Sequence, residues 1–146
     1  MDRDILLMIG ISLLAGSLST MNMWVVNKSH VKTHLNDIYM TLLMTGWMIL
    51  LTYLLLNHMM SSKIWFFVSI IIIVLVIYAI RTQALIGDKQ FLRGMIPHHS
   101  MAILMAEKIK DKTKDNRIKE LANNIIKSQS QEIKQMTEIL DNPLAQ

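Results

Sequence analysis

The sequence predicts an all-α protein in which three transmembrane helices are followed by an amphipathic two-helix hairpin. Hydrophobic residues make up 52% of the chain and the mean hydropathy is +0.35, too apolar for an ordinary soluble domain of 146 residues. Three uncharged apolar runs fill the first 80 residues, and an amphipathic pattern begins after Arg81. We therefore expect a membrane domain over residues 1–81 and a helical-hairpin domain over residues 82–146.

The three runs have the lengths expected of spanning helices. They extend over Ile5 to Val26, Ile38 to Leu56 and Ile64 to Ile80, which are 22, 19 and 17 residues. A bilayer core needs about 20 helical residues. The third run is short, but Lys63 and Arg81 bracket it and can extend to the interfaces. We expect the first run to be an uncleaved span, because no basic segment precedes it and no small-residue cleavage site ends it.

An odd number of spans places the two termini on opposite faces of a cell membrane. The loop Asn27 to Asp37 then lies on the face of the C-terminal domain, and the loop Asn57 to Lys63 lies on the other. Five basic residues near the membrane fall on the first face and two on the second, and this bias predicts a cytoplasmic C-terminal domain. The five are Lys28, Lys32, Arg81, Lys89 and Arg93, against Arg3 and Lys63.

The C-terminal domain has the pattern of two amphipathic helices. The first is predicted from an Asp88 cap to about Lys110, with a kink at Pro97. The second runs from about Arg117 to Leu140. Two neighbouring stripes of the first helix are apolar or aromatic: Phe91, Met95, His98, Ala102, Met105 and Ile109, then Leu92, Ile96, His99, Ile103 and Ala106.

Two helices of this length cannot enclose a core alone. The stripe predicted for the second helix is Ile118, Ala122, Ile125, Gln129, Glu132, Met136 and Ile139 or Leu140. Pairing with a second copy would give a four-helix bundle, so we expect a homo-oligomer. A small-residue face in the first span, formed by Ser12, Gly16 and Ser19, is a further hint of close helix approach.

The residues from Met95 to Met105 are the strongest candidates for chemistry. Two imidazoles and three thioethers fall within these eleven residues, and the chain has 13 methionines and no cysteine. Thioethers favour Cu(I), while imidazole accepts copper and zinc. The candidate ligands are Met95, His98, His99, Met101 and Met105. The alternative is that the methionines are core filler and the histidines are satisfied polar groups.

Further histidines and methionines lie in the first loop and second span. His30 and His34 are four residues apart and would chelate a metal if they lay on one helix. Met40, Met44 and Met48 continue this spacing, although packing or lipid contact also explains them. His58, Met59 and Met60 mark the opposite face. Gln129 and Glu132 interrupt an apolar stripe and could orient a metal-bound imidazole, or instead pair with each other or with lysine.

Motifs of other functional classes are missing from the sequence. It contains no Glu-x-x-His pair, no His-Glu-x-x-His and no phosphate-binding loop, so we do not expect an enzyme. The lysines from Lys108 to Lys114 alternate with aspartates and lack stacking aromatics, which argues against nucleic acid as a partner. Membrane lipids and a second copy of the chain are the expected partners.

Two segments resemble the DUF305 family, a domain of unknown function. These are Phe91-Leu-Arg-Gly-Met-Ile-Pro-His-His-Ser-Met-Ala-Ile-Leu-Met-Ala-Glu107 and Leu121-Ala-Asn-Asn-Ile-Ile-Lys-Ser-Gln-Ser-Gln-Glu-Ile-Lys-Gln-Met136, within residues 85 to 140. The three-span lead, with Tyr39 to Met44 opening the second span, is similar to the membrane-bound branch. The resemblance implies a ferritin-like helical bundle and adds Met136 to the implied ligands. It also implies copper binding and tolerance, as in some soluble members.

The resulting hypothesis is a membrane-anchored copper-binding protein of metal homeostasis or tolerance. Copper is expected as Cu(I) rather than Cu(II), with zinc as the alternative metal. Many members of the family are exported, so the side of the membrane that carries the C-terminal domain stays open. Two rival hypotheses are a subunit of an oligomeric channel or transporter, and a structural module that only drives assembly. The absence of charge within the runs argues against an ion pathway.

Overall fold

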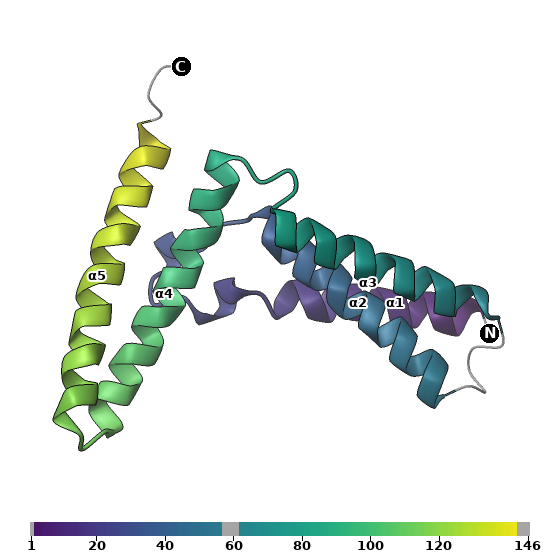
Figure 1. Cartoon of the computed structure of the whole chain (residues 1–146), viewed down its shortest axis with the longest axis horizontal. Coiled ribbons are helices and arrows are strands. Elements are labelled where there is room, and N and C mark those ends of the chain that lie inside the picture. Colours follow the sequence, from purple (N-terminus) through teal and green to yellow (C-terminus); the bar gives the residue numbers. More distant parts are fainter. Residues whose placement is uncertain (1, 57–61, 143–146) are drawn as a thin grey trace. The chain divides into compact units, whose positions relative to one another are not determined.

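The computed structural model describes residues 2–56 and 62–142, and within them the chain is all-α (Figure 1). The α-helices are α1 (Asp2–Leu18), α2 (Leu35–Leu55), α3 (Ile64–Thr82), α4 (Asp88–Lys112) and α5 (Asn116–Asp141). Two short 3₁₀ helices, η1 (Met21–Trp24) and η2 (Lys28–His30), lie between α1 and α2. His58, Met59 and Met60 lie outside the described residues.

The chain forms two compact units. The first combines Met1–Thr20 with Leu35–Leu85, and the second combines Met21–His34 with Ile86–Gln146. The sequence placed a single boundary between residues 81 and 82. The structure differs because it groups residues 21–34, hereafter the strap, with the C-terminal hairpin.

The first unit is built from α1, α2 and α3. Among the described residues, three helical stretches are long and apolar enough to cross a membrane: Asp4–Trp24, which continues past α1 into η1, then Leu35–Leu55 and Ile64–Thr82. Helix α2 packs against both α1 and α3. Gly16 permits a close approach, since a Cβ there would lie 2.9 Å from Cγ2 and 3.1 Å from Cα of Thr41. Ser12 is also buried. From the sequence, the small-residue face of the first span suggested association between subunits. In the structure, Ser12 and Gly16 of this face instead pack within the chain.

Helix α1 ends earlier than the apolar run predicted. The run continues to Val26, but α1 stops at Leu18 and the chain turns into the strap. Hydropathy gives no clear signal for this break, because the residues beyond it are uncharged and include Met21, Met23 and Trp24. These three belong to η1, which packs against α4. The prediction of one continuous helix to Val26 was wrong.

The hairpin of the second unit is close to the prediction in its bounds. Helix α4 continues through Pro97 to Lys112, and α5 follows after three residues. Asp115 caps α5, its Oδ1 accepting the backbone N–H of Arg117 at 2.9 Å. Asp88 does not cap α4: it is the first helical residue, and the cap position is Gly87.

The hairpin core agrees with the predicted stripe of α5 at Ala122 and Met136 and differs from it at other positions. Ile96 and Ile103 of α4 pack with Ile133 and Met136 of α5. Ile133 and the adjoining Ile126 were absent from the predicted stripe, whereas Ile118 and Ile139 are exposed. The prediction chose Ile125 and Glu132, whereas the core uses the residues that follow them, Ile126 and Ile133.

The strap runs beside α4 (Figure 1). Hydrogen bonds between Asn22 and Lys32 connect its beginning to its end. The Asn22 side chain donates to the Lys32 carbonyl at 3.0 Å and accepts from the Lys32 N–H at 2.9 Å. Asn27 caps η2 by accepting the N–H of Ser29. The sequence predicted a span end followed by a loop here; the structure instead has a folded segment that contacts the hairpin.

Candidate metal centre

Helix α4 has three faces with different surroundings, and its candidate ligands lie on two of them. One face packs against α5, a second contacts the strap, and the third is exposed. The spacing of 3.6 residues per turn separates His98 and His99 by about 100°. Their ring centroids are 6.0 Å apart with an interplanar angle of 58°. Adjacent histidines in the sequence therefore have different surroundings.

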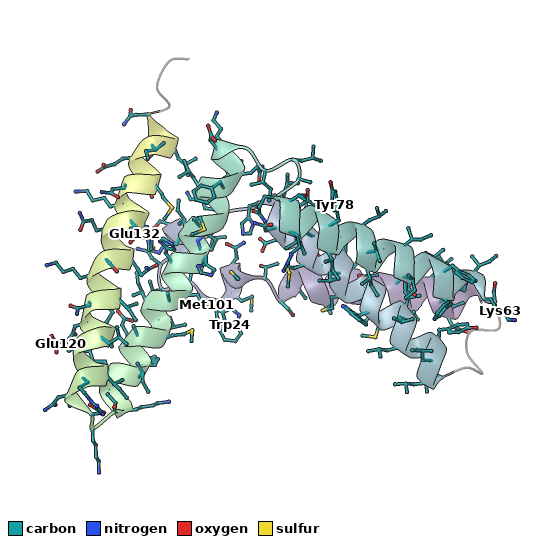
Figure 2. All side chains as sticks on the ribbon, in the orientation of Figure 1. Trp24, Lys63, Tyr78, Met101, Glu120 and Glu132 are labelled. Atoms are coloured by element: carbon teal, nitrogen blue, oxygen red, sulfur yellow. The ribbon has the colours of Figure 1, made fainter. Side chains whose placement is uncertain are left out.

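On the face toward α5, His99 is buried and lies beside Glu132. Its Nδ1 is 3.3 Å from Oε2 of Glu132, although the alignment is not that of a hydrogen bond (Figure 2 labels Glu132 on α5). Burial lowers the pKa of His99; the Glu132 charge opposes this shift in part, and His98 adds to it. The imidazole is therefore mostly neutral near pH 7, the state that coordinates metals.

The carboxylate–imidazole pair has the composition that orients metal ligands in proteins. The sequence proposed that Gln129 or Glu132 would lie near a histidine, and the structure places Glu132 there. Gln129 is half-buried on α5 and forms no hydrogen bond with either histidine within the described ranges. Met95 and Met136, by contrast, pack in the hairpin core.

On the face toward the strap, Ser100 is the point of attachment. Its side chain is fully buried, and its Oγ accepts the N–H of Val26 at 2.9 Å. The same Oγ lies 2.9 Å from Nδ1 of His30. The His30 tautomer sets the direction of this hydrogen bond. If Nδ1–H donates to Oγ, the lone pair of Nε2 is available to a metal; if Nδ1 accepts the Ser100 O–H, Nε2 carries the proton and is not. Burial, and then the charge of Lys32, lowers the pKa of His30.

His30 and His34 do not lie on one helix. The hypothesis that they could chelate a metal required this arrangement, but η2 ends at His30 and residues 31–34 are not helical. His30 is half-buried at Ser100, and His34 is buried. The i, i+4 argument is therefore wrong, although His30 does lie against the helix that carries His98 and His99.

The third face of α4 presents three donors to solvent. His98, Met101 and Met105 occur at positions i, i+3 and i+7, which fall on one side of a helix. His98 is exposed, Met101 is half-exposed and Met105 is 61% exposed (Figure 2 labels Met101 on α4). The sequence grouped Met95 with His98 and Met105, but the Met95 side chain packs against the hairpin core instead.

Nitrogen and carboxylate side chains alone do not form a metal site in the described part of the chain, on α4 or on any other segment. Across residues 2–56 and 62–142, no group of three or more His, Cys, Asp or Glu side chains could hold a metal ion. A metal on α4 would therefore need thioether ligands. Met40, Met44 and Met48 lie on α2 in the other unit, where Met40 and Met48 are exposed.

Sequence reasoning missed Ser100 and Asn22. Ser100 follows two histidines in a helix, and nothing local shows that its hydroxyl binds a backbone N–H 74 residues away. Asn22 lies within an apolar run, where its pairing with Lys32 depends on the turn between them. An asparagine in a predicted span was the one available signal, because an unsatisfied amide in hydrocarbon is costly.

These features define a class of protein with three apolar helices and a C-terminal hairpin rich in histidine and methionine. Residues 79–140 match the model of the domain of unknown function DUF305. The chain is also 55% identical over 138 residues to "Uncharacterized protein L153" of Acanthamoeba polyphaga mimivirus, covering 94% of this chain and 91% of the viral protein. It belongs to the same family as that protein, with DUF305 as its C-terminal domain. No solved structure matches the chain significantly.

Proposed function

We propose that this chain is a membrane-anchored protein that binds copper through the exposed His98–Met101–Met105 face of α4. Its role would be metal homeostasis or tolerance. The observation that carries the proposal is the placement of one imidazole and two thioethers on one accessible face. The core of the single chain uses other methionines, notably Met95 and Met136, so packing within one hairpin does not account for Met101 and Met105.

The donor chemistry favours Cu(I). Two thioethers and one imidazole form a soft set, which suits Cu(I) better than Zn or Cu(II). Zinc would require more nitrogen, oxygen or thiolate ligands than this face offers. His99, which lies beside Glu132, is on the adjacent face and is the nearest additional imidazole along the helix. Its lowered pKa keeps it available as a neutral ligand.

Self-association would complete such a site. An apolar groove continues from the donor face between α4 and α5, lined by Ala102, Met105, Ile109, Ile118, Leu121 and Ile125. Large side chains of this groove are exposed in the single chain, namely Met105, Ile109, Ile118 and Leu121. Pairing with a second hairpin would bury them and supply a second set of donors. The four-helix arrangement expected from the sequence is the proposed form of this pairing.

Anchoring rests on α1, α2 and α3. Their length and apolar composition support three spans, with most of their large side chains available to lipid. Topology is testable because the natural chain has no cysteine. Single cysteines at Arg3 and at Lys127 should label from opposite sides of sealed vesicles; labelling from one side would contradict three spans.

The main experiment is Cu(I) titration of the full chain in detergent against a competing chelator. His98→Ala, and separately Met101→Leu with Met105→Leu, should each weaken binding about tenfold or more, since a ligand is lost. Leucine keeps the apolar volume, so folding should change little. Met40→Leu with Met48→Leu is the matched control on α2 and should bind as wild type.

Each outcome distinguishes the alternatives. Unchanged affinity in both α4 variants would reject the site on this face. Loss of binding only in the α2 variant would instead favour the channel or transporter hypothesis, with the methionines of α2 along the path. Loss in the histidine variant alone would indicate Zn or Cu(II), which prefer nitrogen ligands. No specific metal binding at all would leave the hairpin as an assembly module.

A further inference from the structure

A basic cavity in the second unit lies away from the donor face of α4. It has a volume of about 430 Å³, within the range of small-ligand sites. The strap contributes Lys32 and Thr33, α4 contributes Lys89 and Arg93, and the end of α5 contributes Asp141. Three segments that are distant in sequence thus bring three cations around one opening, against a single carboxylate.

The basic side chains of this cavity are not paired with a carboxylate in the described part of the chain, although Asp141 also lines the cavity. Within residues 2–56 and 62–142, neither Lys32, Lys89 nor Arg93 forms an ion pair. Lys89 and Arg93 are four residues apart on α4, so their side chains extend from the same side of the helix. Lys32 is fixed opposite them through its backbone, which forms both hydrogen bonds with Asn22. Holding like charges together costs free energy unless an anion accompanies them.

We propose that this cavity binds a phosphate group. Phosphate oxygens accept hydrogen bonds from lysine and from the forked guanidinium of arginine, and the Thr33 hydroxyl can add a neutral donor. A divalent cation would be repelled by the three basic side chains, and an apolar ligand would find little apolar lining beyond Val31 and Leu140. The geometry therefore selects an oxyanion of more than one negative charge or a phosphodiester with several acceptors.

Two sources can supply this phosphate: a phospholipid headgroup or a free phosphate compound. Lys32 is three residues before α2 begins, and an extended stretch of that length reaches about 10 Å. If α2 spans a membrane, as proposed above, Lys32 stays near the headgroup layer, where anionic lipid is concentrated. The lipid source rests on that proposed anchoring, whereas the binding of free phosphate does not depend on it.

The alternative is that Lys32, Lys89 and Arg93 only stabilise the fold and bind no ligand. The cavity lies at the C-terminal end of α5, where cations stabilise the helix dipole. The two roles predict different results when the Asp141 carboxylate is removed. Removing this carboxylate strengthens binding of an anion, because one repulsive charge is lost, but a purely structural role for the cations predicts no change in ligand affinity.

The test uses the full chain in a neutral detergent, titrated with inorganic phosphate by calorimetry. In parallel, the chain in nanodiscs of phosphatidylcholine with or without phosphatidylglycerol is analysed for retained lipid by native mass spectrometry. Arg93→Gln should weaken phosphate or anionic-lipid binding about fivefold to tenfold, as expected for loss of a charged hydrogen-bond donor. Asp141→Asn should strengthen it, and higher salt should weaken it. Lys127→Gln, an exposed cation of α5 outside the cavity, is the matched control.

Binding of either probe that depends on Arg93 but not on Lys127 supports the proposal. Retention of phosphatidylglycerol without affinity for inorganic phosphate assigns the lipid source, and the reverse assigns a soluble phosphate compound. If neither probe binds, or if Arg93→Gln and Lys127→Gln weaken binding equally, the cavity is not a phosphate site. Cu(I) affinity is measured on the same Arg93→Gln protein and should be unchanged, which separates this proposal from the metal site.

Discussion

The Ser100 hydroxyl fastens the strap to α4, and Ser100→Ala tests this role. The change removes the acceptor of the Val26 N–H and the partner of His30 Nδ1, both at 2.9 Å. Each lost partner of a buried group costs about 1–3 kcal/mol. Val26 and His30 are only partly buried, so water replaces part of the loss. We therefore expect the strap to open more easily by about 1–2 kcal/mol.

Hydrogen–deuterium exchange of the full chain measures this opening directly. A change of this size should speed exchange of the strap amides by a factor of about 5–30, while the amides of α5 keep their protection. Ser130→Ala is the control, since Ser130 Oγ is exposed and donates only to the Ile126 carbonyl of its own helix. Equal exchange of the strap in wild type and Ser100→Ala would refute the attachment.

Three further predictions concern packing, pH and assembly. Gly16→Ala should lower the free energy of unfolding by about 1–3 kcal/mol, because its Cβ would meet Thr41 at 2.9 Å; Gly10→Ala, with nothing within 4 Å, should not. Burial lowers the pKa of His99 in the folded chain, so as the pH falls the unfolded chain binds a proton before the folded chain does. The melting temperature of the wild-type protein should therefore fall as the pH drops below about 6.5, and that of His99→Gln should fall less steeply. Parallel pH profiles of melting temperature for the two proteins would contradict this. Leu121→Asp should prevent self-association seen by analytical ultracentrifugation while keeping helical circular dichroism, since Leu121 is 59% exposed in the groove of the single chain. Unchanged association would show that this groove is not the interface.

The helices could be predicted from the sequence because their signals are local. Uncharged apolar runs indicated α1, α2 and α3, and the 3.6-residue pattern indicated α4 and α5 to within a few residues at each end. The close contact of Gly16 with Thr41 shows the limit of such reasoning. A small-residue face predicts that some helix approaches closely, but the same face fits a partner within the chain or in another subunit.

The strap could not be predicted, because hydropathy does not distinguish contact with lipid from contact with an amphipathic helix. Its residues continue the apolar run of α1, yet they pack on α4 through a hydrogen bond to Ser100. This long-range contact also decides which face of α4 remains exposed. The sequence named the candidate ligands but grouped Met95 with His98; the structure separates them because the core stripe of the hairpin takes Met95.

The most direct test of the proposed metal site is X-ray absorption spectroscopy at the copper edge on the Cu(I)-loaded full chain. The His98–Met101–Met105 face predicts a first shell with both sulfur and imidazole nitrogen, because these are the donors that it presents. In Met101→Leu with Met105→Leu, the sulfur contribution should disappear. A shell of nitrogen and oxygen alone in the wild-type protein, or sulfur that persists in the double variant, would contradict copper binding at this face.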